Sequence, residues 1–379
     1  MEPPLPNEKT TAANRSLYST IPQATARIQL KLTVATENYP NAAAIAAASI
    51  FARLAARATA AELIQLPMER SMNLSRRALL ARSATLTAGA AVPALPAQAA
   101  AEALPFVLIG DWGRRGKDGQ IQVAGQMGET AAAINSRFTV SLGDNFYEDG
   151  VTGLDDPYWQ TSFEEIYTAA ALQSPWKVIL GNHDYRGNVQ AQLDYSKFSK
   201  RWQLPARYYS VTETLPDGEK ADFFYIDTSP FIHYYAGTKT DISGQDPQQQ
   251  MTWLDSALGA STARWKIVIG HHPIYTAITG EMHDQPDMIA HVDPILRAHN
   301  VPIYINGHDH TLQSTTVKGI TYVTNGAGSK TYQAPPAMRP GFVSDAHGFM
   351  TCKLSSDRLD FALIDLTGKT LYAQTVLPG

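Results

Sequence analysis

Cysteine is almost absent from this chain. Cys352 is the only one among 379 residues, so no internal disulfide bond can form, even in an oxidising compartment. Asp is absent from the first 99 residues, which are rich in Ala and Arg. Beyond about residue 104, apolar runs alternate with polar turns that contain Gly, as in a folded α/β domain. We therefore expect one folded domain over residues 100–379, long enough to bury a large core.

A hydrophobic run long enough to cross a membrane is also lacking. The apolar stretch between Arg82 and Ala99 is short and poor in Leu, Ile and Phe, so it predicts no stable membrane anchor. It follows the pair Arg76-Arg77 and ends in Ala97-Gln98-Ala99. This arrangement resembles a twin-arginine signal peptide cleaved after Ala99, and an Ala-rich amphipathic helix is the alternative. Residues 72–99 thus predict use of the twin-arginine export machinery and a periplasmic or extracellular product.

Residues 1–71 precede this signal, although export signals stand at the N-terminus of a protein. We interpret them as an N-terminal extension that is disordered or reflects a mis-assigned start. Residues 1–99 hold 10 of the 31 basic and 5 of the 35 acidic residues, which leaves the domain 21 basic and 30 acidic residues and a formal net charge of −9. Because nucleic-acid binding depends on Lys and Arg contacts to phosphates, we expect no nucleic-acid partner.

Five apolar runs end in Gly followed by a polar side chain. Runs of this length that are rich in Val and Ile and bounded by Gly indicate buried strands, here at 106–110, 138–143, 176–181, 265–270 and 301–307. Helices are expected at 120–135, 159–171, 190–201, 248–258 and 287–300. Further strands are expected at 222–227, 320–324, 347–354 and 359–364, the last two forming a hairpin. This order predicts an α/β (α+β) fold with two packed sheets flanked by helices.

Side chains able to bind metal follow all five of the Gly-bounded strands. They are Asp111, Asp144, Tyr147, Asn182, His271, His308 and His310. Open α/β sheets place their ligand sites at the carboxyl ends of strands, so these side chains should converge. The set is larger than one tetrahedral ion needs. We therefore predict two metal ions that share one carboxylate.

The predicted ligands fall into an anionic set and a neutral set, which suit different metal ions. Asp111, Asp144 and Tyr147 would give one ion a strongly anionic oxygen shell, which favours Fe(III). Asn182, His271 and one of the paired histidines would give a neutral shell for a divalent ion, with Asp144 bridging. Imidazole ligands suit Fe, Zn or Mn at that second position. His308 and His310 are two residues apart on an extended segment, so both point to the same side.

Five motif blocks carry a family resemblance. They are Gly110-Asp111-Trp112-Gly113, Gly143-Asp144-Asn145-Phe146-Tyr147, Gly181-Asn182-His183-Asp184, Gly270-His271-His272-Pro273 and Gly307-His308-Asp309-His310. In this order they resemble the small, tartrate-resistant type of purple acid phosphatase, within the calcineurin-like metallophosphoesterase superfamily. Tyr147 separates this type from other members of the superfamily. The resemblance covers most of residues 104–340 and implies a four-layer sandwich of two mixed β-sheets flanked by helices, the metallophosphoesterase fold.

The resemblance also implies a role for each ligand. It gives Fe(III) to Asp111, Tyr147 and His310, and makes Asp144 the bridge. It gives the divalent ion to the remaining three, Asn182, His271 and His308. The implied function is an acid phosphatase that hydrolyses monoesters of small phosphorylated substrates by direct attack of a metal-bound hydroxide. Alternatives are a phosphodiesterase or nucleotide-hydrolysing enzyme with the same metals, a non-catalytic phosphate-binding protein, and a redox side activity of the iron.

Three further residues are candidates for catalysis. His183 follows the ligand Asn182, and the resemblance implies that it contacts the phosphate or the leaving group. Asp184 would orient the imidazole and raise its pKa, which would keep it a proton donor. His283 is a candidate second donor, although an exposed loop histidine is an equal alternative. We expect a structural or pocket-rim role for His272, and a place near the site or on the plain surface for the polar loop 237–250.

Overall fold

The computed structural model describes residues 102–278 and 284–379. The predicted signal peptide at 72–99, the extension at 1–71 and the candidate donor His283 lie outside these ranges. Within the described part of the chain, no helix has both the length and the apolar character needed to cross a membrane.

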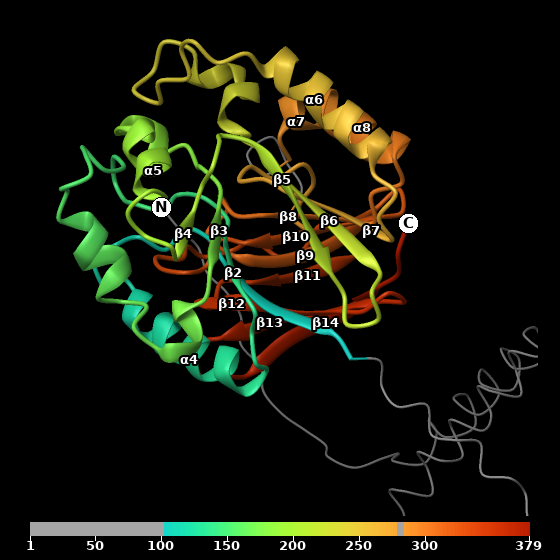
Figure 1. Cartoon of the computed structure of the whole chain (residues 1–379), viewed down its shortest axis with the longest axis horizontal. Helices are drawn as coiled ribbons and strands as arrows, with labels where there is room; N and C mark the ends of the chain where they lie inside the picture. The colour runs from blue at the N-terminus through green and yellow to red at the C-terminus, as the bar shows by residue number, and fades with distance from the viewer. Residues whose placement is uncertain (1–101, 279–283) are drawn as a thin grey trace, which may run out of the picture. The chain divides into compact units, whose positions relative to one another are not determined.

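Two seven-stranded mixed sheets form the centre of the domain (Figure 1). The first has the order β14-β13-β12-β1-β2-β3-β4, with bounds β1 Leu104–Ile109, β2 Thr139–Ser141, β3 Trp176–Val178, β4 Trp202–Gln203, β12 Gly348–Leu354, β13 Leu359–Asp365 and β14 Thr370–Val376. The second has the order β11-β9-β10-β8-β7-β6-β5, with bounds β5 Tyr209–Thr214, β6 Lys220–Tyr225, β7 Trp265–Ile269, β8 Ile303–Asn306, β9 Leu312–Val317, β10 Ile320–Asn325 and β11 Gly341–Ser344.

Each sheet contains a block of four parallel strands, which lies at one edge of the first sheet and at the centre of the second. In the first sheet β1 pairs in parallel with β2, β2 with β3 and β3 with β4, whereas β12, β13 and β14 are antiparallel. In the second sheet β6, β7, β8 and β10 run parallel, and β5, β9 and β11 are antiparallel to their neighbours. The parallel blocks matter for function because parallel strands bring their carboxyl ends to one edge.

Helices cover the outer faces of the sheets (Figure 1). Helix α4 (Gln120–Ala133) packs against β1 and β12 of the first sheet. Helices α6 (Pro247–Ala260), α7 (Pro286–His291) and α8 (Asp293–Ala298) contribute to the apolar cluster on the second sheet. Helix α5 (Val189–Tyr195) follows the third motif block. The two mixed sheets flanked by helices confirm the predicted fold class.

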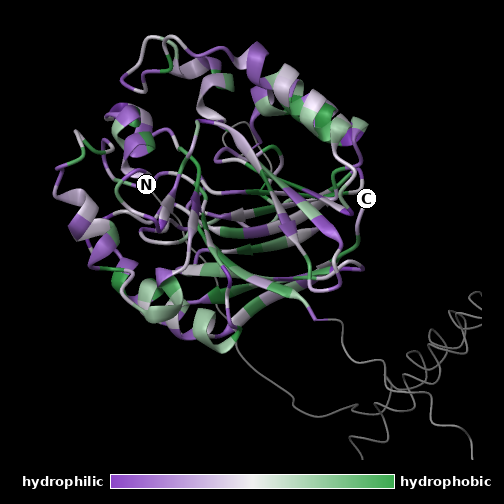
Figure 2. Cartoon of the chain, in the orientation of Figure 1, coloured by the Kyte–Doolittle hydropathy of each residue, from purple (hydrophilic) through white to green (hydrophobic). Residues whose placement is uncertain are grey.

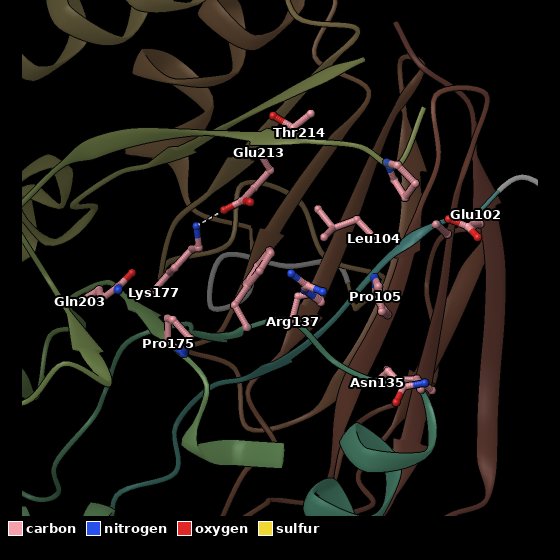
Figure 3. Close-up of a pocket in the computed structure, with 14 residues that line it drawn as sticks. Glu102, Leu104, Pro105, Asn135, Arg137, Pro175, Lys177, Gln203, Glu213 and Thr214 are labelled. Atoms are coloured by element: carbon pink, nitrogen blue, oxygen red, sulfur yellow. Dashed lines mark hydrogen bonds and ion pairs between the residues drawn. The ribbon is translucent and has the colours of Figure 1, made fainter. Parts of the chain in front are cut away.

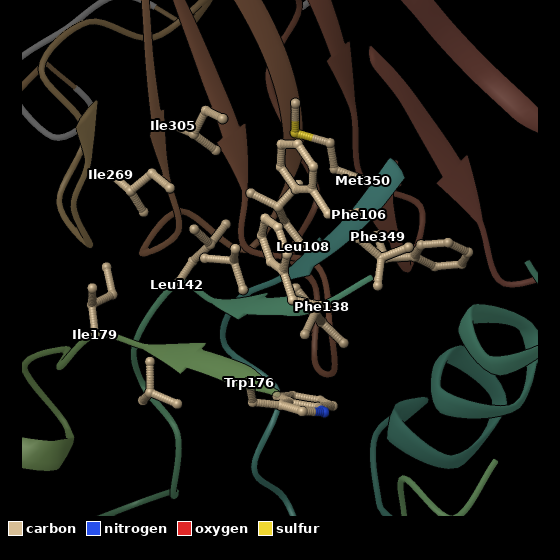
Figure 4. Close-up of a cluster of buried hydrophobic side chains, with 14 of the residues drawn as sticks. Phe106, Leu108, Phe138, Leu142, Trp176, Ile179, Ile269, Ile305, Phe349 and Met350 are labelled. Atoms are coloured by element: carbon tan, nitrogen blue, oxygen red, sulfur yellow. The ribbon is translucent and has the colours of Figure 1, made fainter. Parts of the chain in front are cut away.

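The core follows the alternation of side chains along the strands. On β7, Ile267 and Ile269 belong to the core between the sheets, whereas Val268 belongs to the cluster shared with α6–α8. The ring of Phe106 on β1 meets Phe223 on β6 at 5.6 Å between centroids, so the sheets contact each other directly. Figure 4 shows this inter-sheet cluster, and Figure 2 shows apolar residues concentrated on the strands and polar ones on the outer helices and loops. The period-2 pattern thus sets both apolar layers.

The structure changes several predicted helices. The helix expected at 190–201 ends at Tyr195. The helix expected at 287–300 is split at Val292, because Pro294 has no N–H to continue the hydrogen-bond pattern. The stretch 159–171 begins as a π-helix at Trp159–Glu164, continues as turns, and ends in a 3₁₀ helix at Ala170–Gln173.

All nine predicted strands form, but β4, β5, β9, β11 and β14 were not expected. Strand β9 shows why: it has the polar sequence Leu-Gln-Ser-Thr-Thr-Val, yet Leu312 to Thr315 are buried. The Gln313 side chain accepts hydrogen bonds from the backbone N–H groups of Ala277 and Ile278. Its burial therefore depends on partners that local sequence does not reveal.

Candidate metal centre

The predicted ligands meet where the carboxyl ends of two parallel blocks face each other. Strands β1, β2 and β3 of the first sheet lead into Asp111, Asp144 and Asn182, and β7 and β8 of the second lead into His271 and His308. Asp111 and Asp144 have φ values of 60° and 50°, and His308 has 69°. Left-handed backbone at residues other than Gly is sparsely populated and clusters at functional sites.

Glycine is required beside these ligands because a metal-binding carboxylate from another segment lies too close to leave room for a side chain. A Cβ atom on Gly181 would lie 2.3 Å from both the backbone N and the Oδ1 of Asp144. A Cβ atom on Gly307 would lie 2.5 Å from Oδ2 of Asp111. Gly181 therefore leaves room for the carboxylate of Asp144, and Gly307 leaves room for that of Asp111.

One group of side chains gathers around the hydroxyl of Tyr147. The hydroxyl oxygen lies 2.9 Å from Oδ1 of Asp111, 3.0 Å from Oδ2 of Asp144 and 2.9 Å from Nε2 of His310. A phenol carries a single hydrogen, so it cannot bond to all three neighbours. Four buried or partly buried donor atoms that converge in this way fit a hard, highly charged cation.

A second group lies beside it and is richer in nitrogen. His271 Nδ1 lies 2.8 Å from the carbonyl oxygen of Leu142 and donates to it, so Nε2 is the ring nitrogen that would bind a cation. Although burial opposes it, the charge of Asp144 raises the pKa of His271 to about 9, so a cation would displace a proton from Nε2. This Nε2 atom is 3.3 Å from Oδ1 of Asn182 and 3.3 Å from Nδ1 of His308. Nδ1 of His308 is 3.1 Å from the same amide oxygen. A neutral amide oxygen and two imidazole lone pairs that face one another fit a divalent cation.

Asp144 stands between the two groups. Its Oδ2 atom faces Tyr147 at 3.0 Å, and its Oδ1 atom lies 3.4 Å from Nε2 of His271. Oδ1 also accepts a hydrogen bond from the backbone N–H of His183 at 2.8 Å. With only 2% of the side chain exposed, the carboxylate has little contact with water. Asp144 would therefore contribute to both groups of cation ligands.

The charged side chains of the site shift one another's pKa values. Burial raises the pKa of Asp144, but the positive charges of His271 and His183 outweigh burial and hold that pKa well below its usual range. Burial, and then the charge of His271, lowers the pKa of His308 to about 4, which keeps its imidazole neutral as metal binding requires. Burial and the carboxylates of Asp111 and Asp144 raise the pKa of Tyr147 well above its usual value. The phenol therefore ionises only where a cation offsets these effects.

His183 lies at the open side of the two groups. Its ring centroid is 4.5 Å from that of Tyr147, and its side chain is 16% exposed. Nδ1 is 2.5 Å from the carbonyl oxygen of Glu148 and 2.9 Å from Nη1 of Arg186. Both partners cannot bond Nδ1, because a carbonyl only accepts and a guanidinium only donates. The shorter contact assigns the hydrogen to Nδ1, so Nε2 faces the site, 3.9 Å from Oδ2 of Asp144.

Asp184 has hydrogen-bond partners other than the His183 imidazole that it was expected to orient. Its carboxylate accepts hydrogen bonds from the backbone N–H groups of Asn145 and Gly181 at 3.1 and 2.8 Å, and from the side chains of Asn145 and Gln192 at 3.2 and 2.9 Å. The Nδ1 atom of the His183 imidazole bonds instead to the Glu148 carbonyl. Burial, and then the charge of Asp144, raises the pKa of Asp184 to about 7. Asp184 thus holds together the two loops that carry Asp144, Tyr147 and Asn182.

His272 has both ring nitrogens occupied. Nδ1 lies 2.8 Å from Oγ1 of Thr228, and Nε2 lies 2.9 Å from the hydroxyl of Tyr235. Burial, and then the charge of His308, lowers its pKa well below the usual value. This arrangement agrees with the structural role expected for it.

The loop 237–250 packs close to the metal-binding segments. The hydroxyl of Thr240 donates to the backbone carbonyl of Asn182 at 3.4 Å. Lys239 pairs with Asp149 at 2.8 Å, two residues beyond Tyr147. Of the two locations expected for this loop, the structure therefore supports the one near the site.

Arg114 and Asn145 contribute to the site, but sequence reasoning did not select them. The guanidinium carbon of Arg114 lies 3.7 Å from the ring centroid of Tyr147. The Asn145 side chain, fully buried, donates to Asp184 and to the carbonyl of Ile179. Both residues stand in or directly after a motif block, and this position was the only signal that could have drawn attention to them.

A pocket of about 760 Å³ lies at the opposite ends of the strands and is separate from this centre (Figure 3). Leu104, Phe138 and Lys177 line it, and all three stand at or near the beginnings of β1, β2 and β3. Lys177 forms an ion pair with Glu213 across the pocket. The predicted ligands follow the other ends of these strands, so the pocket has no part in their chemistry.

Comparison with known proteins identifies the family. A family model described as calcineurin-like phosphoesterase matches residues 104–312. Purple acid phosphatase 4 of Arabidopsis thaliana is 39% identical over 287 residues, which cover 71% of this chain and 82% of that protein. Tartrate-resistant acid phosphatase type 5 of Homo sapiens is 32% identical over 310 residues, covering 74% and 93%. This chain belongs to the purple acid phosphatase family. The resemblance inferred from the motif blocks is confirmed, and the protein is a metallophosphoesterase, an acid phosphatase.

Solved structures share the fold of this purple acid phosphatase. GAP50, described as the anchor in the inner membrane complex of Plasmodium, superposes with a TM-score of 0.65 at 26% identity, covering 73% of this chain and 89% of that one. The purple acid phosphatase PPD1 from yellow lupin seeds superposes with a TM-score of 0.55 at 14% identity, covering 73% and 54%. The family implies a dinuclear metal centre that contains iron, and the two groups of donor atoms around Asp144 fit such a centre.

Proposed function

We propose that this acid phosphatase hydrolyses monoesters of small phosphorylated substrates at a dinuclear centre of Fe(III) and a divalent ion, either Fe, Zn or Mn. The position of Asp144 carries the proposal, because its two oxygens face two separate groups of donor atoms. Fe(III) is assigned to the oxygen-rich group, Asp111, Tyr147 and His310. The divalent ion is assigned to the nitrogen-rich group, Asn182, His271 and His308.

The protein's own groups have separate tasks in this mechanism. When bound, the two cations acidify a water molecule and neutralise charge on the phosphate. Asp144 holds the two ligand groups together, and the Leu142 carbonyl keeps Nε2 of His271 available as a ligand. His183 would use Nε2, which faces the site, to give a proton to the departing alkoxide, because Nδ1 is held by the Glu148 carbonyl.

Metal analysis combined with a visible spectrum tests this proposal. We expect one iron and a second metal ion per protein, and a visible absorption band from a phenolate bound to Fe(III). An oxidised protein that holds its full complement of iron but is colourless would overturn the assignment of Tyr147. The chain would then be a two-metal phosphoesterase without a bound tyrosinate.

Substrate class is tested by comparing rates on an aryl phosphate monoester and the matching bis-ester. We expect the monoester to be hydrolysed faster by the purified enzyme with both metals bound. A higher kcat/KM on the bis-ester would instead identify a phosphodiesterase that uses the same metals.

We also propose that the protein is exported by the twin-arginine route. The support comes from the sequence of residues 72–99, in which Arg76 and Arg77 precede an apolar stretch and a small-residue cleavage pattern. Changing both arginines to Lys should retain the enzyme in the cytoplasm, measured as phosphatase activity in fractionated cells. Unchanged export of the variant would contradict this route.

A further inference from the structure

Arg114 is fixed against the segment that presents the iron ligand Tyr147. Its guanidinium carbon lies 3.7 Å from the centroid of the Tyr147 ring, and its Nη1 atom lies 2.6 Å from Oε1 of Glu148. The side chain is only 10% exposed. The backbone N–H of Arg114 donates to Oε1 of Gln120 at 3.0 Å, so both ends of the residue are anchored. The two neighbours that Arg114 contacts, Tyr147 and Glu148, are consecutive in the chain.

The backbone connects the same two segments. The N–H of Tyr147 donates to the carbonyl of Gly113, the residue before Arg114, at 2.9 Å. The Glu148 carbonyl meets Nδ1 of His183 at 2.5 Å. A contact that holds the Tyr147–Glu148 segment therefore acts on a ligand of one cation and on the proposed proton donor together.

The charge of Arg114 acts on the aromatic ring more than on the ligand oxygen. A guanidinium over a ring face attracts its π electrons, and the effect is strongest where water is excluded. Here 2% of Tyr147 and 10% of the Arg114 side chain are exposed. The hydroxyl points away toward Asp111, Asp144 and His310. A cation held by that oxygen is farther from Arg114 than the ring is, so the guanidinium stabilises ring electrons more than metal electrons.

We propose that Arg114 is a positioning residue that holds Tyr147 and lowers its electron-donating power toward the iron, so that it sets the colour and the ease of reduction of the centre. This inference rests on the proposed function, in which Tyr147 binds Fe(III). A visible band that arises from transfer of ring electrons to Fe(III) moves to lower energy when the ring electrons are destabilised. A stronger phenolate donor also favours Fe(III) over Fe(II).

Three variants of the iron-loaded protein test the inference. Arg114→Met removes the charge but keeps a long side chain, so the band should move to longer wavelength and the reduction potential should fall. Arg114→Lys keeps a charge and should leave the band near its original wavelength. Glu148→Gln removes the negative partner of Arg114, so the band should move to shorter wavelength. Arg115→Met is the matched control, because Arg115 stacks on Tyr158 at 4.7 Å and should not affect the spectrum.

The outcomes separate this inference from the function on which it rests. A band displaced in opposite directions by Arg114→Met and Glu148→Gln supports it. Unchanged bands in both variants, with full iron content and a coloured parent protein, overturn it and leave the proposed function standing. A colourless, iron-replete parent protein overturns both. If Arg114→Met does not retain iron, Glu148→Gln decides alone, since a band at shorter wavelength supports the inference and an unchanged band refutes it.

Discussion

Replacing Asp144 by Asn tests the bridge between the two ligand groups with almost no change of shape. The substitution removes one negative charge and turns one carboxylate oxygen into an amide NH₂, which cannot bind a metal ion. The backbone N–H of His183 needs an acceptor 2.8 Å away at the Oδ1 position. The amide oxygen should therefore stay on that side, and the NH₂ group should face Tyr147, where Oδ2 now lies at 3.0 Å.

The size of the effect follows from this orientation. The group of Asp111, Tyr147 and His310 loses one oxygen ligand and one negative charge, whereas the group of His271 and its neighbours keeps its oxygen. Losing a residue that only supports a metal ligand typically weakens metal binding 10- to 100-fold. Losing the ligand itself should cost at least about 100-fold, or about 3 kcal/mol, and should fall mainly on the iron.

The assay measures bound iron and the second metal by elemental analysis, together with the rate on an aryl phosphate monoester. We expect Asp144→Asn to lose iron first and to lose at least about 99% of its activity, in line with that affinity change. Asp144→Ala should lose both metals or their spacing. Asp155→Asn, which removes the charge of an exposed aspartate, is the control and should behave as the parent. An Asp144→Asn protein with two metals and a near-normal rate would show that Asp144 does not bridge.

Three other changes have predicted outcomes. Tyr147→Phe should abolish the visible band and weaken iron binding, and a spectrum that survives the change would exclude the phenolate as its source. His183→Ala should keep both metals but lower kcat by about 10²- to 10⁴-fold, with a smaller loss on substrates that have good leaving groups; equal losses on aryl and alkyl phosphates would contradict its role as proton donor. Burial raises the pKa of Asp227 to about 7, despite opposing effects of Tyr185 and Arg207. The native state therefore holds this proton more tightly than the unfolded state, and stability is lost as the pH rises from about 4 to about 7, by up to about 4 kcal/mol. Asp227→Asn removes this dependence, so its Tm relative to the parent should be higher at pH 8 than at pH 4; a constant difference across that range would refute the shift.

The sequence alone was sufficient for the fold class and for the convergence of the seven predicted ligands. Local patterns carry this information, because Gly-bounded apolar runs indicate parallel strands whose carboxyl ends share an edge. Polar strands such as β9 escaped prediction, since Gln313 is buried through hydrogen bonds to a distant loop. The spacing of His308 and His310 did not decide which of them joins the oxygen-rich ligand group and which joins the nitrogen-rich group. The structure places Nε2 of His310 beside Tyr147 and Nδ1 of His308 beside Asn182.

Only the tertiary structure decided how neighbouring side chains divide their contacts. His183 and Asp184 are consecutive, yet the imidazole faces the open side of the centre and the carboxylate turns inward to four N–H groups. The short 3₁₀ turn that begins at Asp184 sends the two side chains in different directions. Arg114 reaches Tyr147 across 33 residues of sequence because Tyr147 bonds to Gly113. Such contacts depend on how separate segments pack, and no period or spacing within one segment encodes them.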